Sequence, residues 1–171
     1  MKNLILISSS LSENSLSAKL VNYVESRIDN KKIQTKIIDL REFNIPFCDG
    51  RNIENYNPSI KKLYNELKNC DFLIFGFPVY CYSISGVMKN FLDIFSLAMK
   101  DKYFAVCASA GSKMSYLAIS DLYKILKFQS NATGVMPNVL VSNSDIQNGI
   151  FNKETEKLVS QMLSSLIKSD M

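Results

Sequence analysis

The chain has 171 residues, of which 47% are hydrophobic and 21% charged, the ordinary mixture of one globular domain. This composition excludes a disordered or fibrous chain, and a net charge of +4 without a long basic run indicates no nucleic-acid partner. The chain has no histidine, and its four cysteines form no CxxC pair, which excludes histidine-dependent catalysis and indicates that no metal is bound.

Short apolar runs alternate with segments of helical periodicity along the whole chain. Strands are expected at 4–7, 33–40, 72–75, 103–109 and 139–141, and helical faces at 16–28, 59–68, 87–98, 115–128 and 158–167. Pro78 is expected to break the third strand, and Asn152 to cap the last helix. The alternation predicts an α/β fold, a doubly wound five-stranded parallel sheet with helices on both faces, in one domain over residues 1–171.

A serine-rich segment follows the first strand. Residues 8–17 include six serines and lead into the first helix. In a doubly wound sheet, ligands bind beyond the carboxyl ends of the strands, and hydroxyls with free N–H groups at a helix N-terminus suit a phosphate. The alternative is a loop in which Asn14 or Ser15 only caps the helix. The chain has neither GxGxxG nor GxxxxGK[ST], so the usual dinucleotide and P-loop sites are excluded.

Two further loops belong to the same edge of the predicted sheet. After the third strand, Tyr80, Cys81 and Tyr82 form an aromatic loop, which suits a flat heteroaromatic ring. The alternative is a turn whose tyrosines only cover the core. After the fourth strand, the small residues of 108–112 would let a ligand approach the backbone closely. Lys113 could offset negative charge on a reduced cofactor, or it could simply be solvated.

Two of these segments carry a resemblance to a known family. Residues 9–17 (SSLSENSLS) are similar to the GSxRxxSxN segment of NADPH-dependent FMN reductases, a branch of the flavodoxin-like fold. Residues 78–93 (PVYCYSISGVMKNFLD) are similar to the PEYNxSxxGxLKNxxD segment of that family, with Pro, Tyr, Ser, Gly, Lys-Asn and Asp in register. The resemblance extends to residues 39–46 and covers roughly residues 2–145.

The resemblance implies FMN as the cofactor and assigns its contacts by position. The phosphate would be bound by Ser10, Ser12, Ser15, Leu16 and Ser17. The isoalloxazine ring would be lined by Pro78, Val79, Tyr80, Cys81, Tyr82 and Ser83, and bordered by Ser109, Ala110 and Gly111. Ser12 stands where the family usually has an arginine, and the loss of that charge-assisted contact would cost about 1–3 kcal/mol of FMN binding.

The same resemblance implies an NAD(P)H-dependent oxidoreductase. A hydride would pass from the nicotinamide of NADPH or NADH to flavin N5 and on to a flavin, quinone, azo compound, metal oxyanion or similar small acceptor. The chemistry then takes place on the flavin, so no catalytic side chain is expected. Cys81 could relay electrons to the flavin as a thiol, or it could be a small apolar residue.

Two other functions compete with this one. A flavodoxin-type FMN electron carrier would lack direct NAD(P)H activity, and a strongly charged docking face would be expected for it. A flavin-free phospho-receiver is disfavoured, because the segments 8–10 and 76–78 hold no acidic residue where it needs them.

The location and assembly of the protein are predicted from weaker signals. No segment approaches the roughly 20 apolar residues of a membrane helix, and the apolar run at 4–7 is too short for a signal peptide. We therefore expect a cytoplasmic protein without a membrane partner. By analogy with the family, we also expect a homodimer or homotetramer, with its contact at residues 87–98 and the tyrosine-rich loop.

Overall fold

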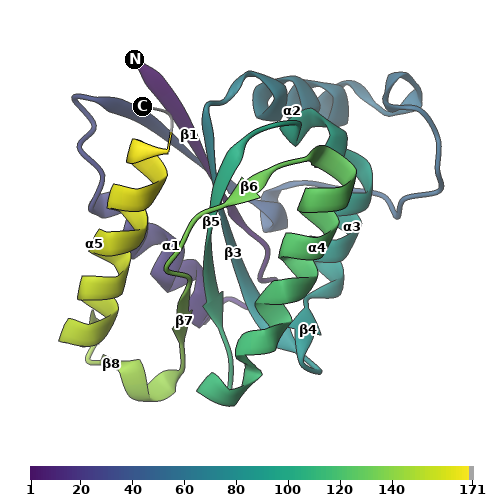
Figure 1. Cartoon of the computed structure of the whole chain (residues 1–171). Helices are drawn as coiled ribbons and strands as arrows, with labels where there is room; N and C mark the ends of the chain where they lie inside the picture. The colour runs from purple at the N-terminus through teal and green to yellow at the C-terminus, as the bar shows by residue number, and fades with distance from the viewer. Residues whose placement is uncertain (170–171) are drawn as a thin grey trace.

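The computed structural model describes residues 1–169 and has a seven-stranded sheet at its centre (Figure 1). Its main path is β2-β1-β3-β5-β6, with β4 paired to β3 and β7 paired to β5. The strands are β1 (Lys2–Ser8), β2 (Ile33–Asp39), β3 (Phe72–Tyr80), β4 (Ser83–Ile84), β5 (Tyr103–Ser109), β6 (Thr133–Gly134) and β7 (Val139–Val141). The order of the strands reverses between β1 and β3, which places the topological switch point at the carboxyl ends of these two strands.

The sheet has more strands than the five predicted. The strands β6 and β7 both pair in parallel with β5, so they divide the last predicted position between them. The short strand β4 pairs antiparallel with the end of β3, and a separate two-stranded sheet joins β8 (Ile146–Gln147) to β9 (Ile150–Phe151). The parallel arrangement of β1, β2, β3 and β5 confirms the doubly wound sheet.

The prediction that Pro78 breaks the third strand is wrong, because β3 continues through Pro78 to Tyr80. The reason lies in the register of the neighbouring strand. Ser9 N–H donates to the carbonyl oxygen of Gly76 at 3.0 Å, so Gly76 directs its backbone groups toward β1. Pro78, two residues later, faces the same side, but β1 has already ended at Ser8. The missing N–H of proline therefore costs no ladder hydrogen bond there.

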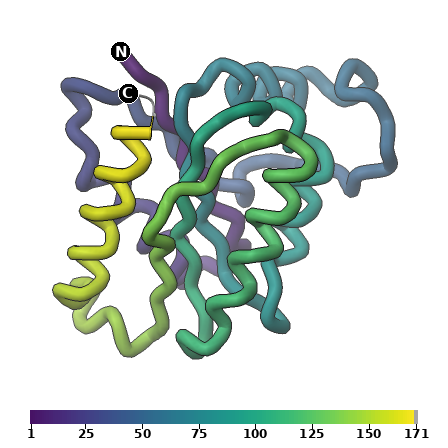
Figure 2. The backbone as a smooth tube through the Cα atoms, in the orientation of Figure 1, coloured from purple at the N-terminus to yellow at the C-terminus, as the bar shows by residue number. Residues whose placement is uncertain are grey.

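Helices cover both faces of the sheet, as predicted (Figures 1 and 2). One face carries α1 (Leu16–Ser26) and α5 (Lys153–Lys168), and the other carries α2 (Pro58–Asn69), α3 (Gly86–Phe95) and α4 (Ala118–Ser130). Asn152 caps α5 by accepting a hydrogen bond from Thr155 N–H, which confirms the predicted cap. The helices α1 and α3 end earlier, and α4 begins later, than their apolar periodicity suggests, and 3₁₀ turns extend α3 and precede α4.

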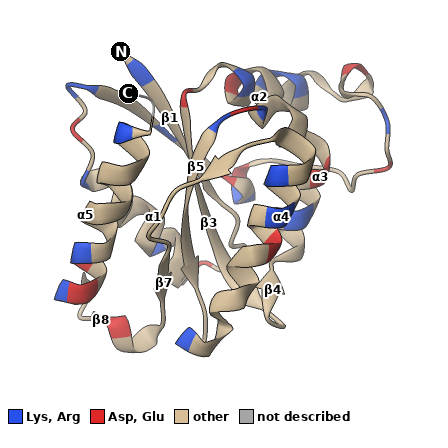
Figure 3. Cartoon of the chain, viewed as in Figure 1, with Lys and Arg blue, Asp and Glu red and all other residues tan. Residues whose placement is uncertain are grey.

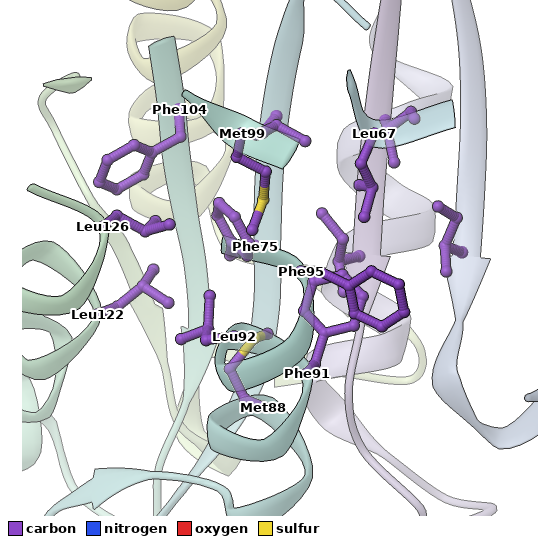
Figure 4. Packing of buried hydrophobic residues seen from close by; sticks show 14 of the residues in the cluster. Leu67, Phe75, Met88, Phe91, Leu92, Phe95, Met99, Phe104, Leu122 and Leu126 are labelled. Carbon is purple, nitrogen blue, oxygen red and sulfur yellow. The ribbon is translucent and has the colours of Figure 1, made fainter. Parts of the chain in front are cut away.

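The larger of two apolar clusters lies between the sheet and helices α2, α3 and α4, and Figure 4 shows part of it. Phe75 of β3 meets Phe104 of β5 edge-on, with ring centroids 5.7 Å apart. Phe91 and Phe95 of α3 are in ring contact at 4.8 Å. All four rings are fully buried, and burial of each is worth about 1.5–3 kcal/mol. This packing fixes α3 and the strands β3 and β5 relative to one another.

On the other face, Gly76 sets how closely α1 approaches the sheet. A Cβ atom built on Gly76 would lie 2.1 Å from Cγ2 of Val21 and 3.2 Å from the carbonyl oxygen of Ile7. Because Gly76 has no side chain, α1 can pack closely on the sheet at this position. Among residues 1–169, no helix has the length and apolar character needed to cross a membrane.

Candidate cofactor site at the carboxyl ends of the strands

The loops singled out in the sequence follow neighbouring strands and meet at one edge of the sheet. In the strand register, Ser8 lies opposite Gly76, and Pro78 lies opposite Ser109. The serine loop, residues 8–17, is tied to the loop after β3 because Ser9 Oγ lies 3.2 Å from Ser85 Oγ. Ser85 in turn caps α3 by accepting from Met88 N–H at 3.2 Å. The loops after β1 and β3 are thus held together at the switch point of the sheet.

The serine loop has buried hydroxyl groups at the N-terminus of α1. Ser15 is the cap, since its Oγ accepts a hydrogen bond from Ala18 N–H at 3.1 Å. Ser15 is therefore the N-cap of α1, and Asn14 does not cap the helix. Leu16 is the first residue of α1, and Ser17 is fully buried with its Oγ 3.0 Å from Ser15 Oγ.

The remaining hydroxyls of the loop have capacity for a ligand. Ser10 is 1% exposed, and its Oγ accepts from the backbone N–H of Ser12 at 3.3 Å, while Ser12 itself is exposed. Ser8 Oγ is buried and has no hydrogen-bond partner among residues 1–169. A buried hydroxyl normally has a partner, so an unpartnered one at the end of β1, where the serine loop begins, suits an anion such as a phosphate.

A cation approaches this loop from the end of β2. Arg41 lies in a 3₁₀ turn, Leu40–Glu42, that directly follows β2, and its Nη1 donates to the carbonyl oxygen of Ser12 at 3.3 Å. Its Nε donates to Asp39 Oδ1 at 3.0 Å, and its Nη2 also donates to this carboxylate. These hydrogen bonds from Arg41 are the main reason that the pKa of Asp39 lies below its usual value.

The loop after β3 is a tight hairpin with a strained turn. Val79 pairs with Ile84 and Tyr80 with Ser83, so Cys81 and Tyr82 alone form the turn. Both have positive φ, 49° and 60°, which is the signature of a type I′ turn that favours Asn-Gly. Left-handed backbone costs about 1 kcal/mol or more at a residue with a side chain. Such strain is found at functional sites more often than elsewhere.

The tyrosines of this hairpin do not cover the core. Tyr80 is 56% and Tyr82 77% exposed, which makes the alternative of core-covering aromatics wrong. The hairpin is fastened on its other side because Ser83 Oγ donates to Asp121 Oδ2 of α4 at 2.7 Å. That hydrogen bond is the main reason that the pKa of Asp121 lies below its usual value.

We expect Tyr82→Gly to raise the free energy of unfolding by about 0.5–1 kcal/mol. Glycine removes the strain of the positive φ in the folded state. This gain in stability exceeds the loss caused by the greater conformational entropy of the unfolded chain. The matched control is Tyr80→Gly, which removes a neighbouring exposed tyrosine from an extended position and should lower stability by about 0.5–1 kcal/mol. Urea unfolding of both variants is the measurement. Equal losses in the two variants would show that the turn is not strained.

The loop after β5 is fastened to β7 and to the loop beyond it. Ser109 is buried, and Ala110 N–H donates to the carbonyl oxygen of Val141 at 2.9 Å, while Gly111 is exposed. Lys113 is not simply solvated, because its Nζ lies 2.9 Å from Oδ1 of Asp145, whose side chain is only 4% exposed. The lysine therefore fastens its loop to the chain beyond β7, and its charge is already matched.

The predicted site residues come from loops that are connected in two ways. The loops after β3 and β5 are neighbours through the register of their strands. The serine loop contacts the β3 hairpin through the hydroxyl groups of Ser9 and Ser85. Neither of these two was assigned to the cofactor from the sequence. Arg41 was also missed, although it lies in the segment 39–46 that supports the resemblance. Asp145 could have been found from the sequence, because its capping box with Ser142 appears there as the pattern Ser-x-x-Asp.

An apolar cavity of about 440 Å³ opens beside the serine loop. Its walls come from the serine loop, the segment after β2, the β3 hairpin and the start of α3, and include Leu11, Phe43, Phe47, Tyr80, Val87 and Asn90. Figure 2 shows that the chain between β2 and α2 extends as a long loop. Asn90 fastens this loop to α3, since its Oδ1 accepts from Cys48 N–H at 2.9 Å and its Nδ2 donates to the carbonyl oxygen of Pro46.

Comparison with known proteins agrees with this architecture. The chain is 27% identical over 143 residues to an NAD(P)H-dependent FAD/FMN reductase of Geobacillus thermodenitrificans, covering 81% of this chain and 77% of that protein. It is 30% identical over 132 residues to an FMN-dependent NADPH-azoreductase of Staphylococcus aureus, covering 74% of this chain and 70% of that protein. The flavoenzyme NAD(P)H:(acceptor) oxidoreductase of Paracoccus denitrificans shares the fold, with a TM-score of 0.79 at 18% identity and 98% coverage of both chains.

The family signature covers most of the chain. The sequence model of the NADPH-dependent FMN reductases matches residues 1–146, which run from the start of β1 past the end of β7. This span includes all of the loops described above, and it confirms the resemblance, the flavodoxin-like fold, the FMN cofactor and the oxidoreductase class predicted from the sequence. The chain belongs to the NADPH-dependent FMN reductase family.

Proposed function

We propose that this protein transfers reducing equivalents from NADPH or NADH, through bound FMN, to a small-molecule acceptor. FMN, when bound, supplies the N5 atom that accepts a hydride from the nicotinamide and gives it up to the acceptor. The proposal rests on one observation: the serine loop and the β3 hairpin lie together at the switch point, where Ser9 contacts both Ser85 and Gly76. The protein contributes binding, orientation and exclusion of water.

The serine loop is the proposed site for the FMN phosphate. Ser10, Ser12, Ser15, Leu16 and Ser17 would present hydroxyl and backbone N–H groups to it. Six serines in ten residues can share the charge of a phosphate among neutral donors, and the dipole of α1 adds to their effect. The Oγ of Ser8 supports this assignment, because this buried donor has no hydrogen-bond partner among residues 1–169.

The two loops beyond β3 and β5 are the proposed site for the flavin ring. The residues that would line it are Pro78, Val79, Tyr80, Cys81, Tyr82 and Ser83 from the hairpin, and Ser109, Ala110 and Gly111 from the loop after β5. Gly111 has open space where a Cβ atom would lie, so a flat ring can approach its backbone closely. Backbone N–H groups in these loops would stabilise negative charge that develops on the ring.

The proposed acceptor is flat and largely apolar, such as a quinone, an azo compound or a second flavin. The cavity beside the serine loop supports this class, because Phe43, Phe47 and Tyr80 give it aromatic walls and Tyr80 also belongs to the ring site. One relative is named for its azoreductase activity. An acceptor with several charges would have to be desolvated against this apolar lining.

An enzyme is favoured over a flavodoxin-type electron carrier by charge as well as by family. Lys and Arg are interspersed with Asp and Glu on α4 and α5 in the view of Figure 3, without the single-sign face that steers protein partners together. We propose that the protein works in the cytoplasm, without nucleic acid or membrane partners.

We further propose that residues 1–171 form one domain and that copies assemble as a homodimer or homotetramer. Both apolar clusters pack on the same sheet, which supports a single unit, and residues 170–171 lie outside the described part of the chain. Exposed apolar side chains around the site, including Leu11, Tyr82 and Tyr116, support a contact between copies there.

The test is an anaerobic visible absorption spectrum of the protein reconstituted with FMN, recorded before and after NADPH or NADH is added. We expect a bound flavin band that bleaches much faster than that of free FMN under the same conditions. A bound band that persists would favour the electron carrier. A protein that binds no flavin would leave the serine loop as a helix cap only.

A further inference from the structure

The serine loop lacks a positive charge of its own. Residues 8–17 contain no lysine or arginine, and they include one acid, Glu13. A phosphate monoester carries a charge of about −1.5 to −2 at neutral pH, and hydrogen bonds from charged donors to it are about twice as strong as those from neutral donors. A cation supplied by another segment of the chain would therefore strengthen the binding of FMN at this loop.

Arg41 is placed to supply that cation. The register of β2 with β1 sets Asp39 opposite Ser8, so the 3₁₀ turn after β2 lies next to the start of the serine loop. The 3.3 Å hydrogen bond from Nη1 to the carbonyl oxygen of Ser12 brings the guanidinium onto this loop. The Arg41 side chain remains 36% exposed, so it is still accessible to a ligand.

The guanidinium also retains donors for a ligand. Arginine has five N–H groups, and the hydrogen bonds from Nε and Nη2 to Asp39 and from Nη1 to Ser12 use three of them. One N–H on each Nη atom is left. Two N–H groups on one planar guanidinium can donate to separate oxygens of a phosphate, with more directional specificity than a lysine ammonium has.

The carboxylates nearby make the cation more important. Asp39, Glu42 and Glu13 all interact with Arg41 and together raise its pKa. Without this arginine, these three carboxylates would lose the cation with which they interact, and their charge would oppose the approach of a phosphate dianion.

We infer that Arg41 is the cation that binds the FMN phosphate, reaching the serine loop from the end of β2. This inference rests on the proposed function, because it requires FMN at the serine loop. Asp39 is then a positioning residue, since its carboxylate holds the guanidinium fork against the loop.

The test compares FMN with riboflavin, which has the same ring and no phosphate. The full-length apoprotein is titrated with each flavin, and the dissociation constants are read from quenching of flavin fluorescence. We expect Arg41→Gln to weaken FMN binding about tenfold and to leave riboflavin binding unchanged. The salt dependence of FMN binding should also become shallower in this variant.

Arg51→Gln is the matched control. Arg51 makes the same fork to the aspartate two residues before it, Asp49, and its guanidinium lies 5.1 Å from the ring centroid of Tyr56. The substitution removes the same charge and the same kind of ion pair, and FMN binding should not change. Arg41→Lys keeps the charge without the fork and should fall between wild type and Arg41→Gln.

Each result bears on the inference in a defined way. Equal loss of FMN and riboflavin binding in Arg41→Gln would mean that Arg41 only shapes the loop. Unchanged FMN binding in this variant would mean that Arg41 plays no part in binding the phosphate. Either result overturns the inference and leaves the proposed function standing. Wild-type protein that binds neither flavin would overturn the proposed function, and the inference with it. Thermal unfolding checks that each variant is folded, and Arg41→Lys carries the test if Arg41→Gln does not fold.

Discussion

Replacing Gly76 with alanine is expected to lower the free energy of unfolding by about 2–3 kcal/mol and to weaken FMN binding. The new methyl group would overlap Cγ2 of Val21, which lies only 2.1 Å from the built Cβ position. Val21 is β-branched and belongs to α1, so it cannot turn aside freely in the helix. The helix must shift, and the serine loop at its N-terminus must shift with it. Urea unfolding and flavin fluorescence titration measure the two effects.

A second substitution separates this overlap from a general loss of packing. Val21→Ala removes the methyl groups that meet the new side chain, at the cost of a small cavity when it is made alone. In the double variant the two changes should compensate, so its loss of stability should be smaller than the sum of the two single losses by about 1 kcal/mol or more. Strict additivity would mean that α1 does not rest on Gly76.

Replacing Asp145 with alanine is expected to lower the free energy of unfolding by about 3 kcal/mol. Its buried carboxylate accepts hydrogen bonds from Ser142 N–H at 2.8 Å and from Asn152 Nδ2 at 3.0 Å, and it pairs with Lys113. Alanine would leave these donors without a partner and release the loop after β5. The matched control is Glu154→Gln, because Glu154 is an exposed partner of the same lysine at 3.8 Å and should contribute less than about 0.5 kcal/mol.

Asp145 also predicts how stability changes in acid. Burial alone would raise the pKa of its carboxyl, but hydrogen bonds from the Ser142 backbone, Lys113 and Asn152 outweigh burial and lower the pKa below its ordinary value of 3.8. The stability that it contributes is therefore complete above that ordinary value and is lost as the pH falls through the lowered pKa of the folded state. Asp145→Asn should lose less stability than wild type between about pH 5 and pH 2. Parallel pH profiles of the two proteins would contradict the assignment.

Much of the fold could be predicted from apolar periodicity. The strands at 103–109 and 139–141 have the predicted bounds, and the helices lie where their apolar faces indicated, within a few residues at the ends. The split of the last strand position and the two-residue strand β4 could not be predicted, because runs of two or three residues carry no measurable period. The sequence alone does not show that Pro78 is tolerated inside β3, because the effect of a missing N–H depends on where the neighbouring strand ends.

The candidate site was predictable where its residues are close in sequence. The serine loop and the hairpin each occupy one continuous segment, so their composition is visible directly. Arg41 and Ser12 are 29 residues apart, and only the register of β2 against β1 brings them together. The pair of Lys113 and Asp145 likewise depends on the pairing of β5 with β7. Contacts of this kind follow from topology and not from local pattern.

Pro78 has a further consequence for how the crevice is hydrated. It is buried, and its backbone nitrogen faces the side on which β1 has ended. Any other residue would present an N–H group there, which would hold an ordered water molecule or remain unpaired at a cost of about 1–3 kcal/mol. An incoming aromatic ring would then have to displace that water before it could settle. With proline at this position there is no such N–H group, so a ring bound at the proposed flavin site would displace no water held by it.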